Sequence, residues 1–286
     1  MSSPRRAAVL GHPVAHSLSP ALHQAAYQAL GLPQWHYERH DVEEADLAGF
    51  LADLGPDWAG LSLTMPLKQV ALPLMDHLEP LAEVVGAVNT VLLPGGGVRV
   101  GANTDVYGMV TALGEVAEAQ WAPRRGVILG GGATAASALA ALGQFGIRAP
   151  VVVVRSMARA GAVVRAGSQM GLEPALVTWG SPQADAALVA AEAVVATPPA
   201  GGADGLAEQV QRAELHPGQV LLDVVYDGWP TPIATAWSAA GGRIAGGDLM
   251  LLHQAVEQVR LMTGRSAPVA VMRAALAKAL GEGHRH

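Results

Sequence analysis

The sequence predicts an α/β protein built from two domains. Its 286 residues exceed what one compact core usually needs and suit two domains of ordinary size. Hydrophobic residues make up 51% of the chain, and aromatic residues are few, so small aliphatic side chains should fill the core. The pattern of elements also changes near residue 126, where a regular alternation of strands and helices begins.

The first part of the chain predicts a mixture of short strands and helices. Pro20 suits the first turn of a helix, and Gly31 is its stop signal. Strands are expected at residues 7–10, 35–42, 60–64, 88–93 and 98–102, and the last two should form a hairpin. Helices are expected at residues 20–30, 47–54, 78–85 and 106–117, with a further helical turn beginning near Lys68.

The second part predicts a parallel sheet covered by helices on both faces. Its strand segments are near-continuous runs of valine and leucine, which is typical of strands buried on both sides. We expect strands at residues 127–129, 151–154, 175–178, 193–196 and 220–224. We expect helices at residues 135–145, 158–170, 184–191, 232–240, 247–262 and 269–280, followed by a frayed tail at 281–286.

A glycine-rich turn joins the first strand and helix of this second part. It comprises Gly130, Gly131, Gly132, Ala133, Thr134 and Ala135. In such a Gly-x-Gly-x-x-Ala turn, the glycines permit a tight turn and close approach of the backbone to a pyrophosphate, which the helix start then holds. The turn indicates a Rossmann-type dinucleotide site, although a chain with 34 glycines also contains such strings by chance.

The end of the next predicted strand favours NADP over NAD. An NAD site usually has an acidic residue there, roughly 20 residues beyond the glycines. This chain has no acidic residue in that region before Glu173. Arg155, Ser156 and Arg159 stand there instead, and the arginines can meet a 2′-phosphate. The alternative is a solvated pair of surface arginines.

Composition and charge exclude several other classes of protein. A net charge of −6 with no basic segment argues against nucleic-acid binding, and the absence of cysteine excludes disulfides and thiolate metal sites. The start of the chain lacks an apolar segment of signal-peptide length, so we expect a cytoplasmic enzyme. The uncharged stretch between Arg125 and Arg148 has the length of a membrane span, but its glycines favour a buried strand, turn and helix.

Polar residues are concentrated in strand-end loops ahead of the glycine turn, where functional sites tend to lie. Three groups stand out: Ser17 with Ser19, Thr64 with Lys68, and Asn89 with Asn103, Thr104 and Asp105. Paired hydroxyls can converge on a carboxylate, and a lysine held by an aspartate can move the proton that hydride reduction of a ketone requires. The alternative is a surface ion pair accompanied by ordinary turn residues.

Several ordered motifs carry a resemblance to a known family. They are Gly11-His12-Pro13-Val14-Ala15-His16-Ser17-Leu18-Ser19-Pro20, Ser62-Leu63-Thr64-Met65-Pro66-Leu67-Lys68, Gly86-Ala87-Val88-Asn89-Thr90, Gly101-Ala102-Asn103-Thr104-Asp105, Asp223-Val224-Val225-Tyr226, Thr231-Pro232 and Gly247-Asp248-Leu249-Met250-Leu251-Leu252-His253-Gln254-Ala255. With these motifs, the chain resembles the shikimate dehydrogenases over nearly its whole length. Its local variants look closest to the actinobacterial type.

The resemblance implies an oxidoreductase that reversibly reduces 3-dehydroshikimate to shikimate with NADPH, in aromatic amino-acid biosynthesis. It implies that Ser17 and Ser19 bind the substrate carboxylate and that Lys68 and Asp105 are the catalytic pair. The other implied substrate residues are Thr64, Asn89, Asp105 and Gln254 at the ring hydroxyls, and Tyr226 near the carboxylate. The implied cofactor residues are Gly130, Gly131, Gly132, Ala133, Thr134, Ala135, Arg155, Ser156, Arg159 and Thr197, with Gly247 and Met250 bordering the nicotinamide. No metal is implied.

The same resemblance implies the division into domains. Residues 1–105 plus 247–286 should form a mixed α/β substrate domain completed by C-terminal helices, and residues 106–246 the NADP-binding domain. Several positions depart from the family pattern, among them Ser62, Val154 and Val195. Ser62 stands where the family commonly has asparagine, so one contact to substrate should be weaker or water-mediated. Val154 and Val195 also replace asparagines, and they bear on cofactor affinity.

Two histidines in the first loop could suggest a metal ion or a general base. His12 and His16 have no carboxylate or histidine partner at ligand spacing in the sequence, so packing or hydrogen bonding is favoured. Two alternative functions remain open: an NAD-preferring quinate/shikimate dehydrogenase, and a catalytically silent nucleotide-binding regulator. In each case we expect a small-molecule ligand, no membrane or nucleic-acid partner, and a monomer or homodimer.

Overall fold

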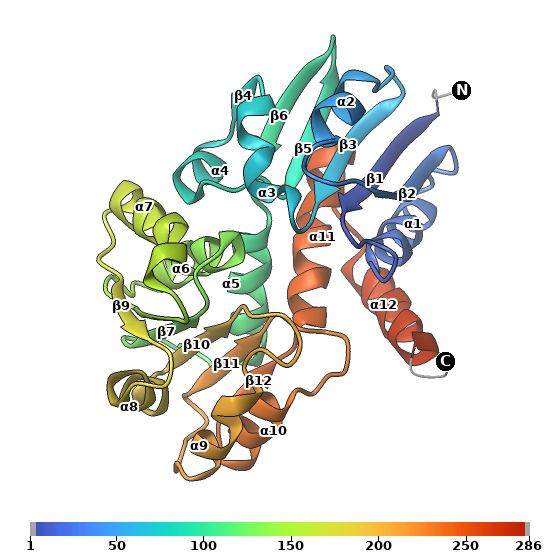
Figure 1. Cartoon of the computed structure of the whole chain (residues 1–286). Helices are drawn as coiled ribbons and strands as arrows, with labels where there is room; N and C mark the ends of the chain where they lie inside the picture. The colour runs from blue at the N-terminus through green and yellow to red at the C-terminus, as the bar shows by residue number, and fades with distance from the viewer. Residues whose placement is uncertain (1–3, 284–286) are drawn as a thin grey trace. The chain divides into compact units, whose positions relative to one another are not determined.

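The structure is a computed structural model that describes residues 4–283, apart from the side chains of residues 159, 282 and 283. The chain divides into two compact units, which Figure 1 shows with the chain coloured from blue to red. The N-terminal unit contains the chain up to Thr104 and again from Leu251 onward. The central unit is Asp105–Met250.

The N-terminal unit contains a mixed sheet with the strand order β2-β1-β3-β5-β6-β4. Its strands are β1 (Arg5–Gly11), β2 (Trp35–Asp41), β3 (Trp58–Leu63), β4 (His77–Leu78), β5 (Thr90–Gly95) and β6 (Val98–Ala102). Strand β1 runs parallel to β2 and β3, whereas β5 is antiparallel to β3 and β6. This topology brings the carboxyl ends of β1, β3 and β6 to the same sheet edge as the amino end of β5.

Helices from both ends of the chain complete the N-terminal unit. They are α1 (Ser19–Ala29), α2 (Leu47–Ala52), α3 (Leu67–Val70), η1 (Leu72–Leu74), α4 (Pro80–Val85), α11 (Gly247–Thr263, in this unit from Leu251) and α12 (Val269–Gly283). Helices α1, α11 and α12 share one buried cluster: Leu22, Ala26, Leu252, Ala255, Val259, Met272 and Leu276. Full burial of one leucine-sized side chain contributes about 1.5–3 kcal/mol. The returning helices are therefore part of this unit's core, and Figure 1 shows α12 alongside α1.

The central unit contains a fully parallel sheet with the order β12-β11-β10-β7-β8-β9. Its strands are β7 (Gly126–Leu129), β8 (Val151–Val154), β9 (Ala175–Thr178), β10 (Ala193–Ala196), β11 (Val220–Asp223) and β12 (Arg243–Ala245). This order is that of a doubly wound dinucleotide-binding sheet, with its switch point between β7 and β10. The predicted α/β fold class, with a mixed sheet and a Rossmann-type sheet, is confirmed.

The helices of the central unit follow its strands in alternation. They are α5 (Asp105–Val116), α6 (Ala133–Gln144), η2 (Met157–Arg159), α7 (Gly161–Met170), α8 (Pro182–Ala190), η3 (Asp204–Leu206), α9 (Ala207–Gln211) and α10 (Pro232–Ala239). The uncharged stretch that begins after Arg125 forms β7, the glycine turn and α6, as predicted. Within residues 4–283, no helix has both the length and the apolar character needed to cross a membrane.

Several expected elements need correction. The helix expected from residue 78 begins at Pro80, because His77–Leu78 pairs with β6 and proline suits a first helical turn. The helix expected at residues 158–170 is divided into η2 and α7. The short elements β4, β12, η3 and α9 were missed, because segments of two to five residues are too short to show a period. Helix α12 continues to Gly283, within the tail that was expected to fray.

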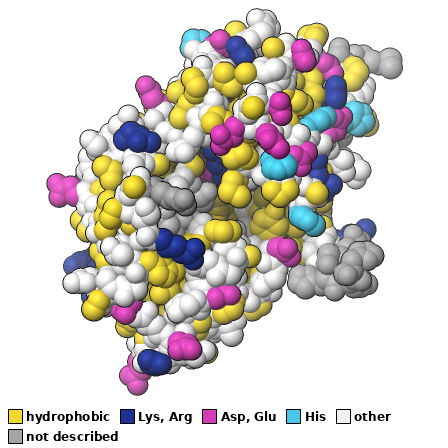
Figure 2. All heavy atoms as spheres, in the orientation of Figure 1, with side chains coloured by type: hydrophobic (Ala, Val, Ile, Leu, Met, Phe, Trp, Pro, Cys, Tyr) yellow, Lys and Arg dark blue, Asp and Glu magenta, His cyan; other side chains and the backbone are white. Residues whose placement is uncertain are grey.

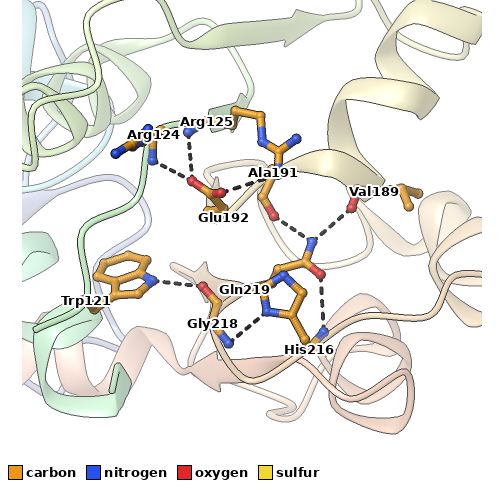
Figure 3. Close-up of polar contacts among 9 residues, drawn as sticks. All are labelled: Trp121, Arg124, Arg125, Val189, Ala191, Glu192, His216, Gly218 and Gln219. Carbon is orange, nitrogen blue, oxygen red and sulfur yellow. Dashed lines mark hydrogen bonds and ion pairs between the residues drawn. The ribbon is translucent and has the colours of Figure 1, made fainter. Parts of the chain in front are cut away.

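Polar contacts fasten the amino ends of the central strands, as Figure 3 shows. Glu192, just before β10, accepts hydrogen bonds from the backbone N–H groups of Arg124 and Arg125, which precede β7. Gln219, just before β11, donates to the carbonyls of Val189 at 2.9 Å and Ala191 at 2.7 Å. These contacts fix the sheet at its amino edge, and the loops at the opposite carboxyl edge carry the predicted cofactor residues.

Candidate active site

The loop after β1 brings two serines together at the start of α1. Ser17 donates its hydroxyl to Ser19 Oγ at 3.3 Å, and the backbone N–H of Ser19 donates to Ser17 Oγ at 3.4 Å. Arg39 holds this loop by donating from Nε to the carbonyl of Ser17 at 2.8 Å. Ser19 is buried and Ser17 half-buried. Two adjacent hydroxyls at a helix start can donate to one anionic group.

The segment after β3 carries Thr64 and Lys68. The backbone N–H of Thr64 donates to the carbonyl of Leu10 at 2.9 Å, which fixes the end of β3 against the end of β1. Lys68 lies in the short helix α3 and is half-buried. Its carbonyl accepts from the backbone N–H of Val88 at 2.8 Å, which joins α3 to the residue before Asn89. The sheet therefore holds the backbones of both residues.

A buried hydrogen-bonded cluster surrounds Asn89. Asn89 Oδ1 accepts from the backbone N–H of Thr104 at 2.7 Å and from Thr90 Oγ1 at 3.0 Å, while Nδ2 donates to Thr104 Oγ1 at 2.9 Å. Asn103 donates to the carbonyl of Ala87 at 3.0 Å. These contacts hold the backbone that follows β6. The next residue, Asp105, is buried and begins α5, so its position in the backbone is also defined.

The substrate-side residues predicted from the first part of the sequence therefore meet at one sheet edge. The residues of this edge are Ser17, Ser19, Thr64, Lys68, Asn89, Asn103 and Thr104, and Asp105, the next residue in the chain, begins the central unit. Gln254, the last predicted residue of this set within the N-terminal unit, lies on α11, is buried, and donates to the carbonyl of Leu251 at 2.9 Å.

Sequence reasoning missed three further buried polar side chains of the N-terminal unit: His23, Tyr37 and Gln258. They form hydrogen bonds that continue from the serine pair toward Asn89, and Ser62 lies among them. One signal was available. Gln258 follows Gln254 by four residues on the same helix, so the two side chains share a face.

The two loop histidines are exposed, and one of them has acidic partners that its sequence spacing did not reveal. His12 Nδ1 hydrogen-bonds Asp41 Oδ1, and its Nε2 lies 3.8 Å from Glu43 Oε1. His12 is therefore a hydrogen-bonding residue, as expected, and its partner is a carboxylate because β2 brings Asp41 beside β1. The hydrogen bond with Asp41 raises the pKa of His12. Within the described chain, no three His, Asp or Glu side chains form a group able to hold a metal ion.

The glycine turn of the central unit has the geometry of a phosphate cradle. Gly130 has φ +112°, and a Cβ at this position would collide with Thr197 Oγ1, which itself donates to the carbonyl of Leu129 at 2.7 Å. Gly132 is exposed, precedes α6, and provides no side-chain cap for its first N–H groups. Gly131, Ala133 and Thr134 are half-buried around it. The helix start therefore presents backbone donors with room for an anion.

Arg155 follows β8 directly and is exposed. Its guanidinium donates to the carbonyl of Gly202 and lies 5.3 Å above the ring of Trp179, the residue after β9. These contacts hold Arg155 at the carboxyl edge of the sheet, with Ser156 next in the chain. Arg159, which ends η2, has a side chain outside the described residues.

The loop after β11 carries Tyr226 and is fastened by a buried aspartate. Asp223 accepts from Thr231 Oγ1 at 2.7 Å and from the backbone N–H of Val225 at 3.1 Å, and burial raises the pKa of its carboxyl. Tyr226 is half-buried. Gly247 donates its N–H to the carbonyl of Val225 at 3.1 Å, and a Cβ there would collide with the backbone of Val224. Met250, one helical turn further along α11, is buried.

The face drawn in Figure 2 shows Lys and Arg side chains standing among acidic and apolar ones, with no continuous basic field. A doubly wound sheet with a glycine cradle, in a chain whose other sheet carries a lysine and paired hydroxyls at one edge, is typical of the class of dinucleotide-dependent oxidoreductases.

Comparisons with known proteins identify the particular family. A family profile described as "Shikimate dehydrogenase substrate binding domain" matches residues 9–91, and one described as "Shikimate 5'-dehydrogenase C-terminal domain" matches residues 250–277. A curated relative from Geobacter metallireducens, "Shikimate dehydrogenase (NADP(+))", is 34% identical over 95% of this chain and 96% of its own length. The chain belongs to the shikimate dehydrogenase family, as its motifs predicted.

Solved structures agree over 96% of the chain. The crystal structure of Mycobacterium tuberculosis shikimate dehydrogenase has a TM-score of 0.85 and 41% identity, covering 96% of this chain and 100% of that one. Shikimate 5-dehydrogenase from Thermus thermophilus, solved with NADP(H) and shikimate, has a TM-score of 0.81 and 32% identity, covering 96% and 99%. The mycobacterial match supports the predicted actinobacterial likeness.

Proposed function

We propose that this chain catalyses the reversible NADPH-dependent reduction of 3-dehydroshikimate to shikimate, a reaction of aromatic amino-acid biosynthesis. The observation that supports the proposal is the sheet edge whose loops carry two serines, Thr64, Lys68 and Asn89, with Asp105 following Thr104 in the chain. These are the groups that a carboxylated, hydroxylated ring with one reducible carbonyl requires. The family membership of the chain supports the same reaction.

The substrate would be held by groups of complementary chemistry. We assign the carboxylate to the hydroxyls of Ser17 and Ser19, which lie within hydrogen-bonding distance of each other. We assign the ring hydroxyls to Thr64, Asn89, Asp105 and Gln254, and a place near the carboxylate to Tyr226. Asn89 is suited to its role because its amide is already oriented by Thr90 and Thr104. A preoriented amide loses little entropy when it binds a ligand.

Lys68 and Asp105 would move the proton. As the ketone of 3-dehydroshikimate is reduced, its oxygen becomes an alkoxide, and Lys68 gives that oxygen a proton. Asp105 holds the ammonium group in place, and in the oxidation of shikimate the same pair accepts the proton.

The central unit fits NADP(H), which supplies or accepts the hydride when bound. The exposed Gly132 and the uncapped start of α6 fit a pyrophosphate, and the fit extends over Gly130, Gly131, Ala133, Thr134 and Ala135. Arg155, with Ser156 and Arg159, fits a 2′-phosphate, because a guanidinium has five donors and one carbonyl occupies few of them. Gly247 and Met250 are assigned to the nicotinamide side, and Thr197 is assigned to the cofactor site. Val154 ends β8 and Val195 lies within β10, and both are buried and contribute apolar packing.

Two alternatives are less well supported. An NAD-preferring quinate/shikimate dehydrogenase needs an acidic group at the end of β8, where this chain has Arg155. A silent nucleotide-binding regulator needs no acid–base pair, yet Lys68 and Asp105 are both present.

The reductive reaction tests the proposal. Purified protein mixed with NADPH and 3-dehydroshikimate should consume NADPH only when both substrate and protein are present, and shikimate should form in equal amount. No consumption of NADPH would overturn the proposed function. A cytoplasmic location and a monomeric or homodimeric state belong to the same proposal, and cell fractionation and light scattering test them.

A further inference from the structure

A buried chain of side-chain hydrogen bonds crosses the N-terminal unit and has no part in the proposed proton transfer. Tyr37 donates to Ser62 Oγ at 2.6 Å, and Ser62 donates to Gln258 Oε1 at 2.8 Å. Gln258 Nε2 donates to Thr90 Oγ1 at 3.0 Å, and Thr90 donates to Asn89 Oδ1 at 3.0 Å. All five side chains are buried. One end of this hydrogen-bond chain is therefore Asn89, a proposed substrate-binding residue.

Its other end reaches the serine pair. Ser19 is close enough to the hydroxyl of Tyr37 to lower the pKa of that hydroxyl. Ser17 in turn donates to Ser19 Oγ. The serine pair therefore lies at the other end of the buried hydrogen-bond chain.

Gln258 is the central member of the chain, and it is fully buried. Its Oε1 accepts from Ser62 and also contacts His23 Nε2 at 3.1 Å. An amide oxygen only accepts, so His23 carries its proton on Nε2. Burial lowers the pKa of His23 to about 3, and the ring stacks on Tyr37 with centroids 4.0 Å apart. In this orientation Oε1 of Gln258 accepts from Ser62 and Nε2 donates to Thr90, so both ends of the amide are hydrogen-bonded.

We propose that Gln258 is a positioning residue for substrate binding, which orients Ser19 through Ser62 and Tyr37, and Asn89 through Thr90. The inference rests on the proposed function, because it assumes that Ser19 and Asn89 hold the substrate. It also gives Ser62 a new role. The family's common asparagine is replaced by a serine whose hydroxyl donates and accepts within the interior, so Ser62 acts through Tyr37 and Gln258 and not as a ligand.

The test is steady-state kinetics of Gln258→Met, a change that keeps the length of the side chain and removes its amide. We expect the Michaelis constant for shikimate to rise about tenfold or more, since buried partners lose hydrogen bonds, while that for NADP+ stays unchanged. Leu252→Met on the same helix α11 is the matched control, because Leu252 is fully buried but apolar, and it should leave both constants unchanged. Unfolding midpoints of both variants are measured alongside.

Tyr37→Phe removes one hydroxyl from the same hydrogen-bond chain, and it is the variant to test if Gln258→Met does not fold. It should raise the shikimate constant severalfold, and the double variant should be little worse than Gln258→Met, because both changes break one chain. An unchanged shikimate constant, equal rises for shikimate and NADP+, or fully additive effects would each overturn the inference. Wild-type protein inactive on shikimate would instead overturn the proposed function, so the two failures are distinct.

Discussion

The two compact units bury polar side chains in different ways. In the N-terminal unit the buried polar residues include Ser19, His23, Ser62, Asn89, Thr90, Asn103, Thr104, Gln254 and Gln258, and most of them hydrogen-bond one another. In the central unit the strands are mostly valine, leucine and alanine, and contacts such as those of Gln219 and Glu192 lie at strand ends.

This difference suggests different tasks: buried polar groups position side chains in the N-terminal unit, and the apolar sheet of the central unit supports its loops. A buried polar group costs free energy unless it is fully hydrogen-bonded, so an interior chain of such groups is rigid once it is complete. The N-terminal unit has such a chain beneath its proposed substrate ligands. The central unit has an apolar sheet that presents backbone donors and Arg155 at its carboxyl edge. Changes in the first unit should therefore affect turnover or substrate binding, and changes in the second should affect cofactor binding or stability.

The largest effect is expected from Lys68→Ala. It removes the proposed acid–base group, so turnover should fall by about a hundredfold or more, while NADP+ binding measured by fluorescence titration stays near normal. The chain has one other lysine, Lys278, which is exposed on α12, so Lys278→Ala is the matched control and should be fully active. Unchanged turnover in Lys68→Ala would show that the proton comes from another group. It would also contradict the expectation that changes in the N-terminal unit affect turnover.

Arg155→Ala should change the cofactor side alone. Losing a charged contact to the 2′-phosphate should raise the Michaelis constant for NADPH by roughly tenfold or more and leave that for 3-dehydroshikimate nearly unchanged. Arg155→Lys keeps the charge and should be affected less. Equal increases for cofactor and substrate would indicate that Arg155 is structural, acting through its contacts with Gly202 and Trp179.

Glu192→Gln should reduce stability without changing kinetics. The backbone contacts to Arg124 and Arg125 hold the pKa of Glu192 below its ordinary value. The stabilisation of about 1 kcal/mol is therefore present above the unfolded-state pKa, near 4.5, and is lost as pH falls through the lower folded-state pKa. Urea unfolding of wild type and variant, at pH 7 and below pH 4, measures the difference in their free energies of unfolding. Glu208→Gln, at an exposed pair with Arg212, is the control and should have no effect.

The smallest effect is expected from His12→Asn. Asp41 raises the pKa of His12 above 6.5, so the protonated pair stabilises the fold fully below about pH 6.5 and the gain disappears as pH rises through the folded-state pKa. The thermal midpoint of the variant should be lower than that of wild type at pH 6 and equal to it at pH 9. The exposed neighbour His16 provides the control His16→Asn. A difference that persists at pH 9 would contradict an ionic origin.

The sequence predicted those parts of the molecule that depend on local chemistry. The valine-rich strands, the glycine turn with Gly130 and Gly132, and the arginine after β8 are all specified by residues close together in the chain. The loops that carry Ser17, Lys68 and Asp105 were found as polar groups, but the family resemblance was needed to assign their roles.

The parts that were missed depend on contacts between distant residues. His23 and Ser62 reach Gln258 across 235 and 196 positions, so no local pattern marks any of the three as members of one chain. His12 meets Asp41 because two parallel strands lie side by side, although 29 positions separate them. Short strands such as β12 were missed because so few residues pair only when a neighbouring strand is already in place.

Initial rates with shikimate and quinate, each with NADP+ and NAD+, test the central claim most directly. The lack of an acidic group at the end of β8 and the presence of Arg155 predict that kcat/KM is highest for shikimate with NADP+, and that replacing NADP+ by NAD+ lowers it by roughly tenfold or more. A clear preference for NAD+, or for quinate over shikimate, would contradict the assignment of cofactor choice to the central unit and of substrate choice to the N-terminal unit.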